Sequence, residues 1–308
     1  MGLIQGHGGA SLLTRARAAA TLVVALSFAA VAAPAARAQT YVLAPPPAAV
    51  IKDTANNGLY YEITGKGQNY VILIHGFAVD DRMWDDQAVV LAPYFRVLRY
   101  DLPSHGKSSS LAARAPGWLA LAQLMDQLQI QKASIVGMSA GATTAADFAL
   151  VHPERVDRLV LVSPSIDGYV PKQPMAWFGP IAAQARAGHP DSAAALFASS
   201  AFMQTWGLND AGKVRAMVMA NARVWTDTVP PRPPLTPPAL GRLGQIQSAP
   251  LVIVGANDSP DIRAVADTII ASIPGSKLVV IPNAGHFVNL DHPGRFDEAL
   301  VNWLLGVP

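Results

Sequence analysis

The motif G-x-S-x-G at residues 137–141 follows directly on the apolar run 133–136. The residues after it, 142–150, have helical spacing, and this pattern stops before His152-Pro153. A buried strand, a tight G-x-S-x-G turn and a helix together predict a nucleophile elbow, which holds a serine above the edge of a sheet. Ser139 is therefore the candidate nucleophile. The alternative is a glycine-lined turn whose serine only caps the helix.

Strand-end segments on both sides of this motif complete a larger pattern. Residues 71–77 form a predicted strand that ends in His-Gly-Phe, and residues 99–108 form a strand followed by a D-x-P-x-H-G-x-S turn. Near the C-terminus, residues 251–258 and 281–287 are apolar runs that lead to Asp258 and His286. In this order the segments resemble those of the α/β-hydrolase superfamily, nearest to its capped esterases, lactonases and C–C bond hydrolases. The resemblance covers residues 51–305.

The resemblance implies an α/β fold, with a mostly parallel, doubly wound sheet of α/β-hydrolase type and a helical cap inserted after the sixth strand. Alternating strand and helix patterns independently favour a parallel sheet. Residues 51–165 and 249–308 are predicted to form the core, and residues 166–248, which carry helical patterns, the cap. Strands are predicted near 59–63, 70–74, 95–100, 133–136, 158–162, 250–254 and 277–281, and helices over 119–128, 140–151, 181–187, 192–201 and 211–224.

The N-terminus has the composition of a secretory signal peptide. Residues 18–33 are almost entirely apolar, Arg15 and Arg17 precede them, and an A-x-A site ends at Ala38. The apolar run is short for a membrane span of about 20 residues, so an uncleaved anchor is the lesser alternative. We expect cleavage after Ala38, a Pro-rich spacer over 39–50, and a periplasmic or secreted enzyme without a stable membrane anchor.

Charge and cysteine content narrow the functional classes. The chain of 308 residues has a formal net charge of +2, and residues 1–38 contain three arginines and no acidic residue, so the cleaved chain carries −1. No basic patch then suggests nucleic acid as a partner. The absence of cysteine excludes disulfides, thiolate metal sites and a cysteine nucleophile. No metal and no organic cofactor are predicted.

A serine hydroxyl becomes nucleophilic only beside a base that a third group orients. Ser139, Asp258 and His286 occur in the order serine, acid, histidine that this fold uses. Asp261, in the same loop as Asp258, and Asp167, after the strand at 158–162, are the alternative acids. Among the other histidines, His75 is expected to brace the loop that supplies the oxyanion hole, and His105 to stabilise its own turn. His152 and His292 are expected to lie at helix ends.

The resemblance also implies an oxyanion hole made of two backbone N–H groups, those of Ala140 and Phe77. Their side chains are expected to matter little, whereas Gly76 lets the chain turn towards the substrate.

Large apolar side chains are candidates for a substrate pocket, although each of them is at least as well explained by packing of the cap on the core. These candidates are Met138, Trp84, Trp177, Phe178, Phe202, Trp206, Trp225 and Phe287. They favour a small-molecule substrate with an apolar or aromatic part.

The predicted reaction is hydrolysis of a carboxylic ester or lactone through an acyl-enzyme. Three alternatives share some or all of these residues: hydrolysis of a C–C bond in a β-diketone-like substrate, acyl transfer or perhydrolysis, and a non-catalytic ligand-binding module. A fold shared by so many activities does not distinguish their substrates.

Overall fold

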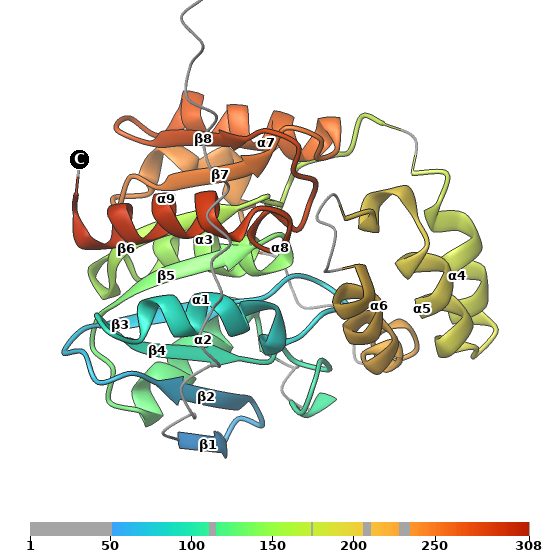
Figure 1. Ribbon diagram of the computed structural model, residues 1–308, viewed down its shortest axis with the longest axis horizontal. Helices are drawn as coiled ribbons and strands as arrows, with labels where there is room; N and C mark the ends of the chain where they lie inside the picture. The colour runs from blue at the N-terminus through green and yellow to red at the C-terminus, as the bar shows by residue number, and fades with distance from the viewer. Residues whose placement is uncertain (1–50, 111–114, 174, 206–210, 228–234, 308) are drawn as a thin grey trace, which may run out of the picture. The chain divides into compact units, whose positions relative to one another are not determined.

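A computed structural model describes residues 51–110, 115–173, 175–205, 211–227 and 235–307. The predicted signal peptide and spacer lie outside these ranges. Within them the chain forms one sheet of eight strands in the order β1-β2-β4-β3-β5-β6-β7-β8 (Figure 1). The strands are β1 (Ile51–Thr54), β2 (Tyr60–Thr64), β3 (Tyr70–Ile74), β4 (Arg96–Tyr100), β5 (Ala133–Met138), β6 (Val156–Val162), β7 (Leu251–Gly255) and β8 (Lys277–Ile281).

Strands β3 to β8 pair in parallel, whereas β1 and β2 run antiparallel at one edge. The predicted mostly parallel α/β fold is confirmed, and each predicted strand is present to within two residues at either end. β1 was not predicted, because all four of its residues are exposed and leave no apolar pattern in the sequence.

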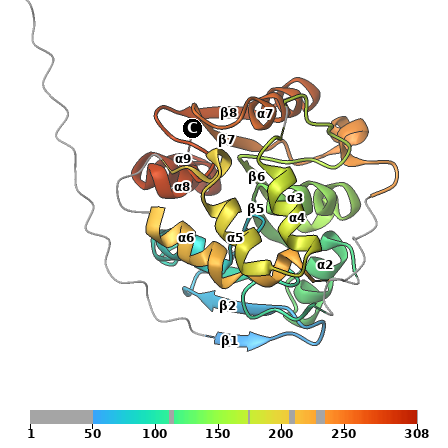
Figure 2. The same cartoon turned by 90° about the vertical axis from the view of Figure 1, so that its right-hand side faces the viewer.

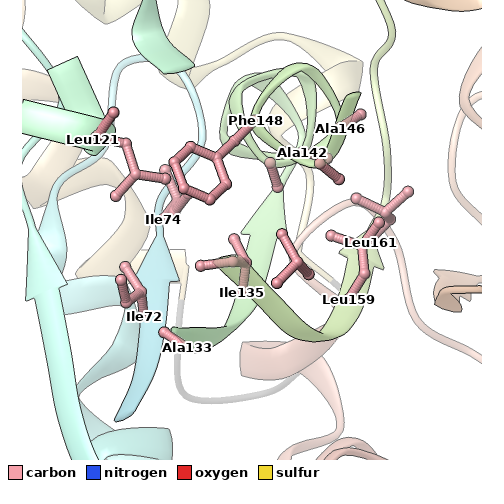
Figure 3. Packing of buried hydrophobic residues seen from close by; sticks show 14 of the residues in the cluster. Ile72, Ile74, Leu121, Ala133, Ile135, Ala142, Ala146, Phe148, Leu159 and Leu161 are labelled. Atoms are coloured by element: carbon pink, nitrogen blue, oxygen red, sulfur yellow. The ribbon is translucent and has the colours of Figure 1, made fainter. Parts of the chain in front are cut away.

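Both faces of the sheet are buried, which explains why the central strands are apolar throughout. Successive side chains of a strand point to opposite faces, so Ile72 and Ile74 of β3 pack into one cluster and Val71 and Leu73 into another. Figure 3 shows the first cluster, in which Phe148 lies over the side chains of the central strands.

Helices cover the two faces in separate layers. Most buried apolar residues of α2, α3 and α7 belong to the first cluster, and those of α1, α8 and α9 belong to the second. The bounds of these helices are α1 (Asp85–Leu91), α2 (Gly117–Gln127), α3 (Ala140–Val151), α7 (Pro260–Ser272), α8 (Val288–Asp291) and α9 (Pro293–Leu305).

The interval between β6 and β7 forms the cap. Its helices α4 (Phe178–Arg186), α5 (Pro190–Ala198) and α6 (Ala211–Ala220) lie together, as seen in Figure 2. The last part of the predicted cap interval behaves differently, because the 3-10 helix η6 (Ala239–Gln245) buries Ala239 and Leu243 against the core helices. None of the helices in the described ranges combines the length and the apolarity needed to cross a membrane.

Candidate active site

Ser139 alone makes the turn between β5, which ends at Met138, and α3, which begins at Ala140. Its backbone has φ 52° and ψ −115°, a conformation that costs a residue other than glycine about 1–3 kcal/mol. The Ser139 N–H donates to the carbonyl of Val162 at 2.9 Å, which ties the turn to the end of β6. The serine is thus held at the carboxyl edge of the sheet by its own neighbours.

The two glycines of the motif permit this turn. A Cβ added to Gly137 would collide with the carbonyl of Gly141, and a Cβ added to Gly141 would collide with the carbonyl of Ile74. Each of these obstacles is backbone and cannot rotate away as a side chain could. The absence of a side chain at Gly137 therefore lets β5 approach the start of α3, and its absence at Gly141 lets α3 approach the end of β3.

Asp258 and His286 come from the loops after β7 and β8, respectively. The Nδ1 atom of His286 lies 3.1 Å from each carboxylate oxygen of Asp258. Only 6% of Asp258 and 4% of His286 are exposed to solvent. A buried carboxylate in this position favours the tautomer with the proton on Nδ1, so that Nε2 is the basic nitrogen of the ring.

The alternative acids lie elsewhere. The charge of Asp167 acts on Asp147, whose pKa is raised to about 7, first by burial and then by Asp167. The carboxylate of Asp261 accepts hydrogen bonds from the Tyr169 hydroxyl and from two backbone N–H groups of the segment 169–173. Of the three candidate acids, the structure brings Asp258 to His286.

The loop after β3 runs against the serine. A Cβ on Gly76 would lie 3.4 Å from the Ser139 Cβ, which is contact distance rather than a collision. The loop at Gly76 therefore lies close to Ser139. A side chain at position 76 would nevertheless fit, so the position needs a glycine less than the sequence predicts. Within the described ranges, neither the Phe77 N–H nor the Ala140 N–H donates a hydrogen bond to another group of the protein. Both residues line a cavity together with Ser139.

Two histidines brace this loop from beneath. His75 donates from Nδ1 to the carbonyl of Gly76 at 2.7 Å, and its Nε2 accepts the N–H of Leu102 at 2.8 Å. His105 accepts the N–H of Ala78 on its Nε2 at 3.0 Å. His105 therefore supports the loop after β3 as well as its own turn, and only the second of these contacts is predicted from the sequence.

The cavity at Ser139 and His286 has a volume of about 220 Å³ and a largely aromatic lining. The ring centroid of Phe202 lies 4.4 Å from that of His286. The structure brings six of the eight predicted pocket residues to this cavity, namely Met138, Trp177, Phe178, Phe202, Trp225 and Phe287.

The assignment of Trp84 to the pocket is wrong. Its side chain is fully buried in the core cluster of α1 and α9, with its ring 6.1 Å from that of Phe296. The short 3-10 helix Asp81–Trp84 directs it between the helices and the sheet. The remaining predicted residue, Trp206, lies outside the described residues.

Three further residues line this cavity and were not predicted as pocket residues from the sequence: Ser165, Phe197 and Met203. Phe197 lies in a segment predicted to be helical, but nothing in a single sequence shows which face of a cap helix meets the core. The Phe77 side chain was expected to matter little. Its ring packs against that of Trp225, with centroids 5.1 Å apart, and forms part of the wall.

Among the described residues, one cluster of three aspartates offers the ligand types of a metal site. Carboxylate oxygens of Asp80, Asp81 and Asp101 lie within 4.8 Å of one another. Asp80 is already held by the Arg82 guanidinium, and Asp101 accepts the backbone N–H of Asp81. Arg99 lies 3.6 Å from Asp81 and supplies positive charge at the same place. This arrangement fits an internal ion-pair network better than a cation site.

Comparison with known proteins agrees with this fold. The model of the alpha/beta hydrolase family matches residues 71–299, which include all the residues described at the site. Among curated relatives, a hydrolase of oxononadienedioates from Pseudomonas putida is 26% identical over 80% of this chain and 91% of its own length. A pimeloyl-[acyl-carrier protein] methyl ester esterase from Nitrosomonas europaea is 28% identical over 77% of this chain and 96% of its own.

Solved structures give the same answer. A hydrolase from Pseudomonas aeruginosa PA01 superposes with a TM-score of 0.65 at 27% identity, covering 82% of this chain and 97% of that protein. A thermophilic esterase from Thermogutta terrifontis superposes with a TM-score of 0.66 at 26% identity, covering 83% and 98%, respectively. The chain therefore belongs to the alpha/beta hydrolase family, and its relatives place it among the hydrolases.

Proposed function

We propose that this chain is a serine hydrolase that cleaves carboxylic esters, lactones included, through an acyl-enzyme. The observation that carries the proposal is that Ser139, Asp258 and His286, which follow three different strands, lie together at one edge of the sheet. Ser139 and His286 line one cavity, and Asp258 holds the other nitrogen of the imidazole. This is the set of groups that acyl transfer to a serine requires.

In the first half of the reaction, the Ser139 hydroxyl attacks the carbonyl carbon of the ester while Nε2 of His286 takes its proton. Asp258 stabilises the imidazolium that forms. The carbonyl oxygen becomes an oxyanion, which the N–H groups of Phe77 and Ala140 stabilise. The imidazolium then protonates the leaving alcohol, and the acyl group stays on the serine.

In the second half, His286 removes a proton from water, which attacks the acyl-enzyme and releases the acid. The largely apolar cavity supports this step, because charges that develop in a poorly hydrated site interact more strongly with fixed dipoles. No step in this scheme uses a metal or a cofactor.

Hydrolysis of a C–C bond is the second candidate, because the relative that hydrolyses oxononadienedioates is about as similar to this chain as the esterase relative. Such a substrate carries two carboxylates, and buried carboxylates need cationic partners. Among the described residues that line the cavity there is no lysine and no arginine. This lining favours neutral esters. Acyl transfer and perhydrolysis would share the acyl-enzyme and differ only in the acceptor, whereas a mere binding module would not need a strained Ser139.

The test is Ser139→Ala, with Ser165→Ala as its control, because both serines line the cavity. We expect Ser139→Ala to fold normally, to lose at least about 10³-fold in kcat on p-nitrophenyl esters, and to resist labelling by a fluorophosphonate. Ser165→Ala should still be labelled. A wild-type protein that resists the probe would contradict the proposal, and turnover of a dienedioate without turnover of any ester would replace it by the second candidate.

We also propose that the chain is exported to the periplasm or beyond, on the strength of the apolar run 18–33 and the A-x-A site at Ala38. N-terminal sequencing of protein recovered from the periplasm should begin at Gln39. Full-length protein in the cytoplasm would contradict this proposal and leave the enzymatic one untouched.

A further inference from the structure

A second cavity meets the first at the nucleophile. It has a volume of about 280 Å³, and four residues line both cavities: Ser139, Ser165, Trp177 and Phe202. The rings of Trp177 and Phe202 stack, with centroids 5.5 Å apart and planes 15° from parallel. This stacked pair forms a shared wall between the two cavities, and Ser139 lies where they join.

The catalytic groups are distributed unequally between the cavities. His286, Phe77 and Ala140 line the first cavity, together with the rings of Phe178 and Trp225. None of these five residues lines the second, which is bordered instead by residues of α7 and of the segment before α4.

The side chains of the second cavity are different in kind. The buried side chains of Ile166, Ile262 and Val265 make its inner wall aliphatic. The exposed Met175 lies at its rim together with the polar residues Tyr169, Gln173, Ser259 and Asp261. The first cavity suits a flat ring, because aromatic side chains pack well against other rings. The second suits a flexible aliphatic chain.

The tetrahedral intermediate decides which part of an ester enters which cavity. Its carbon carries the serine oxygen, the oxyanion, the leaving alcohol oxygen and the acyl chain. The oxyanion must meet the N–H groups of Phe77 and Ala140, and the alcohol oxygen must receive its proton from His286. Both demands are met in the first cavity. The acyl chain is the remaining substituent, and the second cavity is the other space that opens at Ser139.

We propose that the enzyme prefers esters of aliphatic acids with aromatic alcohols, the acyl chain lying in the second cavity and the ring of the alcohol in the first. This inference rests on the proposed function and deepens it. The Trp177–Phe202 pair separates the two parts of the substrate.

The experiment measures kcat/KM for two substrate series: phenyl esters from acetate to decanoate, and hexanoates of phenol and ethanol. Ile262→Phe and Met175→Trp each fill the second cavity, and Met175, which is 46% exposed, tolerates a larger side chain with little risk to folding. Phe178→Ala enlarges the first cavity. Ile270→Phe is the control on the same helix, outside both cavities.

We expect the two filling variants to lower the octanoate-to-acetate ratio about tenfold, since each excluded methylene matters to a fitted pocket, and to leave the phenol-to-ethanol ratio within about twofold. Phe178→Ala should lower the phenol-to-ethanol ratio alone. Filling variants that fold and alter the alcohol ratio, or neither ratio, would overturn the inference. A wild-type enzyme that cleaves no ester and binds no fluorophosphonate would instead refute the proposed function.

Discussion

Two sets of hydrogen bonds between the cap and the core differ in burial. Near the end of the cap, Asn221 donates to Asp80 at 2.8 Å and accepts the N–H of Gly106 at 2.6 Å. Asn221 is 1% exposed and Asp80 is 2% exposed. Close by, Arg223 donates to four backbone carbonyls of the turn 104–108. We call these contacts the rear attachment.

The front attachment is a single carboxylate. Asp261, at the start of α7, accepts hydrogen bonds from the Tyr169 hydroxyl and from the N–H groups of Lys172 and Gln173. Its bonds to the two N–H groups are exposed to solvent. These contacts hold the segment 169–173 at the rim of the second cavity.

From this difference in burial we infer that the rear attachment serves stability and catalysis, and that the front attachment controls access to the second cavity. The rear attachment contacts the turn that carries His105. His105 in turn accepts the N–H of Ala78, the neighbour of Phe77, whose N–H is the proposed oxyanion donor. The front attachment reaches only the rim, where water can replace each bond. Loss of the rear attachment should therefore affect folding and rate, whereas loss of the front attachment should release one segment.

The largest effect is expected from Asn221→Ala. The change leaves the buried carboxylate of Asp80 with one donor fewer, and unsatisfied buried groups are costly. We expect the free energy of unfolding to fall by about 3 kcal/mol, as measured by urea denaturation. Asn302→Ala, an exposed asparagine on α9, is the control and should change it by less than about 0.5 kcal/mol. Equal effects of the two substitutions would remove the distinction between buried and exposed attachments.

A smaller effect, seen in the rate, is expected from Arg223→Lys. Two guanidinium nitrogens donate to the carbonyls of residues 104–108 in a planar fork, which an ammonium group cannot reproduce. We expect kcat on esters to fall by roughly tenfold, equivalent to about 1.4 kcal/mol, with a smaller change in KM. Arg215→Lys, at an exposed site of the cap, should leave both constants unchanged. A change confined to KM would mean that the rear attachment does not position the oxyanion loop.

The rear attachment also shows where prediction from the sequence ends. Neither Asn221 nor Arg223 belongs to a motif, and each finds its partners in the core more than 100 residues away. The elbow at Ser139 was predictable because its strand, turn and helix are contiguous. The positions of Asp258 and His286 were predictable because parallel strands bring their carboxyl ends to one edge of a sheet.

The sequence also does not show which aromatic residues line the cavity. Trp84 and Phe197 are both large aromatic residues, and the structure places each of them in a short helix. Both side chains are buried in the second cluster, but only that of Phe197 also lines the cavity, because distant partners fix the rotation of each helix. Strand β1 could not be predicted for a related reason. It is held by its pairing with β2, and it buries no side chain that would give an apolar pattern in the sequence.

The smallest effect is expected from Asp261→Asn, which weakens the front attachment without touching the core. We expect stability close to that of the wild type and faster trypsin cleavage after Lys172, because the segment 169–173 opens more often. Asp267→Asn, an exposed acid on the same helix, is the control and should not change the cleavage rate. Cleavage of the Asp261 variant at the wild-type rate would mean that other contacts hold the front of the cap.

Acid should open the front attachment in the wild type. The N–H of Lys172, then that of Gln173 and the Tyr169 hydroxyl, hold the pKa of Asp261 below its ordinary value of 3.8. A depressed carboxyl pKa stabilises the closed segment fully above that value, and this stabilisation is lost as the pH falls through the lowered pKa. Hydrogen-exchange protection of the Lys172 and Gln173 amides, corrected for intrinsic rates, should therefore stay constant near neutral pH and decrease below about pH 4. In Asp261→Asn the protection should be low and independent of pH, because the group that titrates is gone, whereas a pH dependence that survives the substitution would assign the acid sensitivity to another group.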